Sequence, residues 1–217
     1  MSETNPVPFP DPENNFIPEP IVLFQEWLAH ARAVEPNDPN AACLATVDSQ
    51  GFPAARMVLV KQIDERGFAF YTNLHSAKGQ DLEENPRAAL CFYWKSFRHQ
   101  VRIRGPVIRL DEEEADDYFA SRPRGHQMGA WASRQSKIME DSTALERSYA
   151  AYEDKFTAQE SISRPPYWSG YRICPLRIEF WRDRKSRLHD RIVYTSPQDE
   201  HGWPATGEVW HAERLYP

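Results

Sequence analysis

The chain has 217 residues, and its 26 lysines and arginines against 32 aspartates and glutamates give a formal net charge of −6. This balance argues against a general nucleic-acid coat or a protein that binds anionic membranes, because both depend on excess positive charge. The length predicts one domain with appendages, large enough to bury a core and to be an enzyme.

Residues 1–18 are rich in proline and hold no lysine or arginine, which predicts a flexible N-terminal arm before a single domain over 19–217. Pro20 suits a first helical turn, and apolar residues at helical spacing follow it, so we expect a helix over 19–34. Apolar and β-branched runs then alternate with short turns that end in glycine, which predicts an antiparallel meander. Its expected strands cover 42–47, 55–63 and 68–72.

The second half of the chain mixes further strands with helices. Ser76 can cap a short helix that ends at Glu84, and Asp111 with Glu114 forms a capping box for a helix that Pro123 ends. A third helix is expected over 142–157, and strands over 88–94, 100–110, 171–181 and 187–195. Short strands interrupted by a few helices predict an α+β fold around an antiparallel sheet or barrel.

Several common kinds of site lack support in the sequence. There is no glycine-rich phosphate loop, no GxSxG, and none of the seven histidines has HxH or HExxH spacing. The three cysteines, Cys43, Cys91 and Cys174, are far apart and are expected to be reduced thiols. No apolar run approaches the roughly 18 residues of a membrane span, and the start does not have the pattern of a signal peptide, so we expect a cytoplasmic protein.

Four segments place cations where an anion could bind. Arg56 and Lys61 close an apolar strand, although charges at strand ends also mark the solvent boundary. In 187–191, strand periodicity would put Arg187, His189 and Arg191 on one face, as in a basic edge strand or an anion site. Tyr118 and Arg122 have i, i+4 spacing, which suits a phosphate monoester but also occurs as a simple surface stack. In 71–78 a predicted strand leads into the start of a helix, and the segment contains hydroxyl groups and a lysine. These groups could bind an anion or could simply cap the helix.

Together these segments resemble the pyridoxamine (pyridoxine) 5′-phosphate oxidase family. The resemblance runs from residue 20 to the C-terminus and rests on RMVLVK at 56–61, FYTNLHSAK at 70–78, RHQV at 98–101, YFASRPRGHQMGAWASRQS at 118–136, IEFW at 178–181, RLHDR at 187–191 and the terminal ERLYP. It implies an FMN-binding split β-barrel with Greek-key-like antiparallel strands and flanking helices. It also implies a homodimer with FMN at the interface and oxidation of pyridoxamine or pyridoxine 5′-phosphate by O₂ to pyridoxal 5′-phosphate and H₂O₂.

The resemblance also assigns residues. The implied FMN contacts are Arg56, Met57, Val58, Leu59, Lys61, Tyr71, Thr72, Lys78, Gln100, Gln135, Ser136, Trp181 and Arg191. The implied clamp on the substrate phosphate is Lys61, Tyr118 and Arg122, with His126 where a serine usually completes it. Arg187 and His189 are the implied catalytic pair that holds the substrate against the flavin. No metal is implied. Ala77 stands where many members have an arginine, which leaves the FMN phosphate one cation fewer.

Two other functions fit part of this pattern. The first is an FMN oxidase of the same fold with a different substrate, as in the relatives from phenazine biosynthesis; Lys61, Tyr118 and Arg122 favour a phosphorylated substrate instead. The second is a flavin or pyridoxal-phosphate carrier that binds without turnover.

Overall fold

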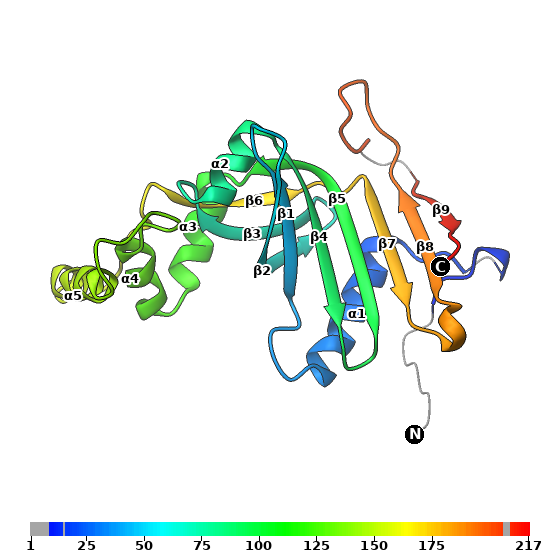
Figure 1. Ribbon diagram of the computed structural model, residues 1–217, viewed down its shortest axis with the longest axis horizontal. Helices are drawn as coiled ribbons and strands as arrows, with labels where there is room; N and C mark the ends of the chain where they lie inside the picture. Colours follow the sequence, from blue (N-terminus) through cyan, green and yellow to red (C-terminus); the bar gives the residue numbers. More distant parts are fainter. Residues whose placement is uncertain (1–8, 15, 206–208) are drawn as a thin grey trace.

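The computed structural model describes residues 9–14, 16–205 and 209–217. Six strands close into an antiparallel barrel in the order β4-β1-β2-β3-β6-β5, and β5 pairs again with β4 (Figure 1). They are β1 (Ala41–Val47), β2 (Pro53–Asp64), β3 (Gly67–Asn73), β4 (Arg87–Trp94), β5 (His99–Arg109) and β6 (Trp168–Ile173). From β5 the sheet continues through β7 (Arg177–Arg182), β8 (Asp190–Thr195) and β9 (His211–Arg214). The predicted α+β split-barrel class is confirmed.

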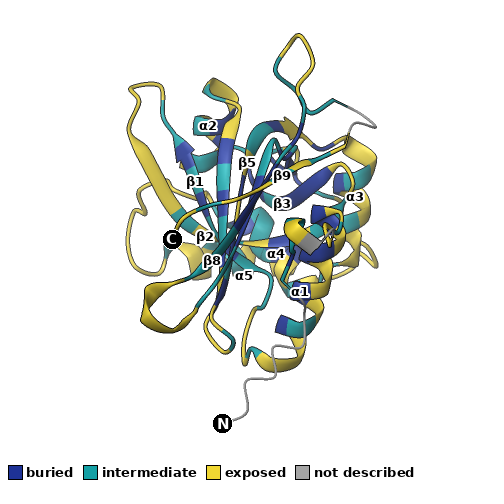
Figure 2. Cartoon of the chain, turned by 90° about the vertical axis from the view of Figure 1, so that its right-hand side faces the viewer, coloured by how far each residue is buried: buried dark blue, intermediate teal, exposed yellow. Residues whose placement is uncertain are grey.

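The core lies inside the barrel, and helix α1 (Pro20–Val34) packs its apolar face onto it. Glu19, the residue before Pro20, caps this helix, because its side chain accepts a hydrogen bond from the Val22 amide. Phe24 lies with its ring centroid 4.9 Å from those of Phe68 on β3 and Phe92 on β4, which are on opposite sides of the barrel. Figure 2 shows this organisation as buried strand segments under largely exposed loops and outer helix faces.

Four further helices follow the barrel strands: α2 (Ala77–Glu84), α3 (Glu112–Ser121), α4 (Arg124–Ala132) and α5 (Ala144–Phe156). The predicted caps are confirmed, because Ser76 accepts from the Gly79 amide and Asp111 from the Glu114 amide. Helices α3 to α5 lie to one side of the barrel around a smaller apolar cluster that includes Phe119, Phe156 and Trp168 (Figure 1). No described helix has the length and apolarity needed to cross a membrane.

The barrel is split between β2 and β3. These strands pair only from Val60 and Phe70 toward their common turn, and the register shifts between Val60 and Gln62. The preceding residues of β2, Arg56–Leu59, pair with β1 on one side, and no described strand pairs with them on the other. A bulge of this kind redirects a strand and ends its pairing, so β2 has a free backbone edge at this point.

The structure corrects the sequence prediction at the C-terminal strands. The strand expected over 171–181 is two strands, β6 and β7, with Pro175 between them. The strand expected over 187–195 begins only at Asp190, because a 3-10 helix covers Lys185–Arg187. Ser186 and Arg187 there have φ of 58° and 62°. The expectation that Arg187, His189 and Arg191 share one strand face is therefore wrong. Helix α4 and strand β9 were not predicted.

Part of the expected N-terminal arm, residues 1–8 and 15, lies outside the described residues. In the described part, the Phe9 ring lies 6.1 Å from Trp27 of α1, and Asp11 accepts a hydrogen bond from Arg214 of β9. The three cysteines are free thiols and half-buried.

Candidate active site

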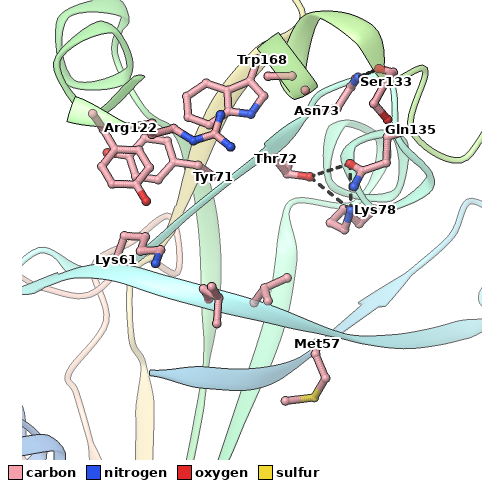
Figure 3. Close-up of a pocket in the computed structure, with 15 residues that line it drawn as sticks. Met57, Lys61, Tyr71, Thr72, Asn73, Lys78, Arg122, Ser133, Gln135 and Trp168 are labelled. Atoms are coloured by element: carbon pink, nitrogen blue, oxygen red, sulfur yellow. Dashed lines mark hydrogen bonds between the residues drawn. The ribbon is translucent and has the colours of Figure 1, made fainter. Parts of the chain in front are cut away.

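A cavity of about 340 Å³ opens in the split of the barrel (Figure 3). Its wall contains three cationic side chains, those of Lys61, Lys78 and Arg122, and no aspartate or glutamate among the described lining residues. An acid-free pocket with three cations suits an anionic ligand, because each charge removed from water needs a partner of opposite sign. The other predicted residues that line it are Met57, Val58, Leu59, Tyr71, Thr72, Tyr118 and Gln135.

One end of the cavity is polar and is built around Lys78 in the first turn of α2. Its ammonium lies 3.1 Å from Thr72 Oγ1 and 3.3 Å from Gln135 Oε1 (Figure 3). It also lies 3.4 Å from Ser76 Oγ. All three partners are neutral oxygens. Burial, and then the nearby positive charge of Arg56, lower the pKa of Lys78. A phosphate at this point would supply the missing negative charge.

The other end of the cavity is aromatic. Tyr71 of β3 stacks on Tyr118 of α3 with ring centroids 3.9 Å apart, and Trp168 of β6 lies parallel to Tyr71 at 5.4 Å. Arg122, the residue that caps the C-terminus of α3, places its guanidinium 4.8 Å from the centre of the Trp168 ring. Burial raises the pKa of Tyr71 to about 12, which keeps its hydroxyl protonated near neutral pH.

Arg122 has a guanidinium nitrogen whose surroundings suit an anionic ligand. Its Nη1 is buried and has no hydrogen-bond partner among the described residues, and burial lowers its pKa. A buried guanidinium nitrogen without an acceptor costs free energy, so such groups normally have a partner. Lys61, Tyr118 and Arg122, for which the family resemblance implies a phosphate clamp, line the same cavity.

Arg56 lies on β2 beside the cavity but is outside its lining residues. Its Nη1 donates to Thr46 Oγ1 at 2.5 Å, and its Nη2 lies 3.4 Å from Asp81 Oδ2 on α2. These contacts hold Arg56 against the helix that carries Lys78. Ser136 follows the lining residue Gln135 and has φ of 69°. His126 is exposed in the first turn of α4 and is also outside the lining set.

A second group of predicted residues lies together elsewhere on the chain. Gln100, Trp181 and Arg191 are register partners across β5, β7 and β8, so they form one row on the sheet. The His189 ring lies 4.7 Å from that of Trp181, and its Nδ1 is 3.1 Å from Asp183 Oδ1. None of these residues lines the cavity of its own chain, and neither does Arg187. Strands β7 and β8 lie on the opposite side of the barrel from helices α3 and α4 (Figure 1).

Sequence reasoning missed five residues that line the cavity: Asn73, Gly129, Ala130, Ser133 and Trp168. Four of them fall within the motifs at 70–78 and 118–136, so the motif boundaries could have indicated them. Trp168 had no such signal. It reaches the site because β6 pairs with β3, with Trp168 opposite Asn73.

The cavity fits a planar phosphorylated cofactor such as a flavin mononucleotide. The free edge of β2 offers backbone donors and acceptors to the rim of a heterocyclic ring, and Lys78 with its neighbours offers donors to a phosphate. The fold and this site define the class: an antiparallel split barrel of the flavin-binding type.

Comparisons with known proteins identify the family within that class. Residues 29–156 match the family described as pyridoxamine 5′-phosphate oxidase, and residues 168–217 match the pyridoxine 5′-phosphate oxidase C-terminal dimerisation region. The chain belongs to the pyridoxine/pyridoxamine 5′-phosphate oxidase family. Curated proteins of that name from Brucella canis and Brucella suis biovar 1 are 55% identical over 199 residues, which is 92% of this chain and 94% and 92% of theirs.

Solved structures agree with the fold. PhzG from Burkholderia lata, in complex with tetrahydrophenazine-1-carboxylic acid, has a TM-score of 0.84 and 32% identity over 97% of this chain and 99% of that one. A pyridoxamine 5′-phosphate oxidase-related, FMN binding protein from Nostoc punctiforme has a TM-score of 0.69 at 18% identity, over 93% of this chain and 100% of that one. The second likeness concerns the fold alone.

Proposed function

We propose that this protein is an FMN-dependent oxidase that converts pyridoxine or pyridoxamine 5′-phosphate to pyridoxal 5′-phosphate while O₂ is reduced to H₂O₂. With the amine substrate, the imine formed is hydrolysed by water, which releases ammonia. The observation that carries the proposal is the acid-free cavity in the barrel split, with Lys61, Lys78 and Arg122 in its wall. Two phosphorylated molecules, cofactor and substrate, account for cations at both ends of one cavity. The 55% identity to curated oxidases of that name supports this substrate class.

The proposed roles follow from position. Lys78, Thr72 and Gln135 bind the FMN phosphate, and the free edge of Arg56–Leu59 binds the ring. Lys61, Tyr118 and Arg122 bind the substrate phosphate and thereby orient the reacting carbon. The bound FMN would supply the redox chemistry, as hydride acceptor for the substrate and electron donor to O₂. The protein residues supply binding, orientation and exclusion of water, so no strong general base is required.

The second group, Gln100, Trp181, His189 and Arg191 with Arg187, completes the site in our proposal through a homodimer. The match of residues 168–217 to a dimerisation region supports a dimer. The outer face of the barrel supports it too, because Met57 and Tyr93 are 64% and 50% exposed there. Large apolar side chains gathered on one face are typical of protein interfaces. In such a dimer each site takes the cavity from one subunit and the Trp181 row from its partner. We further propose that 19–217 act as one domain, since strands of both matched regions share one sheet.

Oxygen uptake and peroxide release test the reaction directly. We expect turnover with pyridoxamine and pyridoxine 5′-phosphates, much weaker turnover with their unphosphorylated forms, and none with a reduced phenazine-carboxylic acid. Oxidation of the phenazine compound alone would assign the chain to the PhzG type of activity. A yellow FMN-loaded protein that releases no peroxide would identify a carrier and refute the oxidase.

Subunit mixing tests the shared site. Lys61→Ala removes a cavity residue and His189→Ala a residue of the second group, so each homodimer is impaired. When the two variants are co-expressed and pair at random, half of the dimers are mixed and hold one intact site. About a quarter of wild-type activity is therefore expected at substrate concentrations well below the raised KM of Lys61→Ala. No recovery in mixed dimers would place both groups in one subunit's site and refute the shared arrangement.

A further inference from the structure

An acidic residue with no role in the proposed function, Glu179, lies beside the second group of site residues. On the outer face of the sheet, the row Gln100, Trp181 and Arg191 is followed by the row Arg102, Glu179 and Val193. Glu179 is the single acid in these two rows and is only 3% exposed. A carboxylate this deeply buried is tolerated only when cations and hydrogen-bond donors surround it.

Glu179 holds Arg191 by two donors. The Arg191 Nε donates to Glu179 Oε1 at 2.9 Å, and Arg191 Nη2 lies 2.8 Å from the same oxygen. The other oxygen, Oε2, accepts a hydrogen bond from Arg102 Nη2. On its far side the Arg191 Nη1 donates to the carbonyl of Tyr216 at 2.8 Å. The guanidinium is thus fixed from both ends, and its orientation is set before any ligand arrives.

Three arginines surround Glu179, and Arg177 is the most distant, with its Nη2 3.9 Å from Glu179 Oε2. The two that hydrogen-bond to Glu179, Arg102 and Arg191, differ in exposure. The Arg102 side chain is 50% exposed, whereas that of Arg191 is 24% exposed. An exposed arginine pair contributes little, while a half-buried, two-donor pair fixes the geometry of a long side chain that otherwise samples many rotamers. The contact with Arg191 is therefore the one that matters for the position of the guanidinium.

We propose that Glu179 is a positioning residue that orients Arg191 toward the FMN of the partner subunit. It does not touch the cofactor; it acts through Arg191. This inference rests on the proposed function, in which Arg191 contacts FMN. It predicts that loss of the Glu179 charge weakens FMN binding only as long as Arg191 is present.

The test is a double-mutant cycle on FMN affinity, measured by quenching of flavin fluorescence as apoprotein is titrated. We expect Glu179→Gln and Arg191→Ala each to raise the FMN Kd about tenfold. The double variant is expected to bind no more weakly than Arg191→Ala alone, because the two residues act as one unit. The matched control is Arg102→Met, which removes the other hydrogen-bond donor to Glu179 and is expected to change the Kd less than about threefold.

The outcomes separate the two proposals. If Arg191→Ala binds FMN as tightly as wild type, the proposed role of Arg191 fails. If Arg191→Ala weakens binding but Glu179→Gln does not, or if the two effects simply multiply, Glu179 has only a structural role and our inference is overturned. Should Glu179→Gln fail to fold, Glu179→Asp keeps the charge but shortens the reach. It is expected to raise the Kd less than Arg191→Ala does, and an unchanged Kd would contradict positioning.

Discussion

Replacement of Lys78 by methionine should separate ligand binding from folding. Among the described residues, the hydrogen-bond partners of the Lys78 ammonium are all neutral oxygens, on Thr72, Ser76 and Gln135. Burial and the charge of Arg56 lower its pKa, so the folded apoprotein disfavours the charged form. The unfolded chain therefore binds the proton more readily, and this penalty is present at neutral pH and is relieved as the pH rises toward 10.5.

The expected magnitudes follow from the phosphate contact. A hydrogen bond to a charged group contributes about 1.5–3 kcal/mol, and each 1.4 kcal/mol is a factor of ten, so the FMN Kd should rise about 10- to 100-fold. The apoprotein, in contrast, should melt at the same temperature as wild type or higher, because the methionine carries no charge to desolvate. Any gain in stability should shrink as the pH is raised toward 10.5.

Two measurements check this prediction: flavin fluorescence quenching for the Kd, and thermal unfolding of the apoprotein. Lys95→Met is the matched control, because it removes the same charge from an exposed residue in the turn between β4 and β5. A lower melting temperature with an unchanged Kd would refute the reasoning, because Lys78 would then serve the fold and not the ligand.

Three other variants test the site and the core. Lys61→Ala should raise KM for the phosphorylated substrate about 10- to 100-fold with little change in kcat, because the clamp binds ground and transition states alike; an unchanged KM in steady-state kinetics would remove Lys61 from the clamp. His99 is buried with a pKa of about 4 instead of 6.5. Wild-type stability should therefore fall by about 3 kcal/mol as the pH drops from 6.5 to 4, and urea titrations of His99→Phe should lose that slope. Arg172, with its side chain 1% exposed, pairs with Asp64 and Glu114, so Arg172→Met should cost about 3 kcal/mol in urea unfolding; a loss below 1 kcal/mol would count against this ion-pair network.

Local patterns gave the sequence prediction most of its success. Caps, turns and strand periodicity are decided by neighbouring residues, so α1, the opening meander and the cap at Ser76 could be predicted. Pro123 predicts the end of the preceding helix, and Gly125 and Gly129 weaken the helical pattern beyond it. Helix α4 forms there nonetheless, because Met128 and Ala132 are buried by tertiary packing.

The site was predictable where it is local and not where it depends on strand pairing. Tyr118 and Arg122 are one helical turn apart, so their pairing follows from spacing, whereas only the family resemblance joins Lys61 to them. The row of Gln100, Trp181 and Arg191 exists only because three strands align in one register. The same is true of Trp168, which pairing with β3 brings to the cavity. Periodicity within one segment contains no information on such alignments.

The register shift between Val60 and Gln62 has a consequence for which rings the cavity accepts. The amides and carbonyls of Arg56–Leu59 that would have faced β3 stay at the fixed spacing of a β-ladder, because β1 still holds the strand from behind. A heterocycle bound there substitutes for a strand, so its rim must alternate donor and acceptor atoms as a backbone does. Each mismatch would leave a buried backbone group unsatisfied, at a cost of about 1–3 kcal/mol. In the proposed FMN complex, a single bulge would thus select the cofactor by the order of polar atoms along its edge.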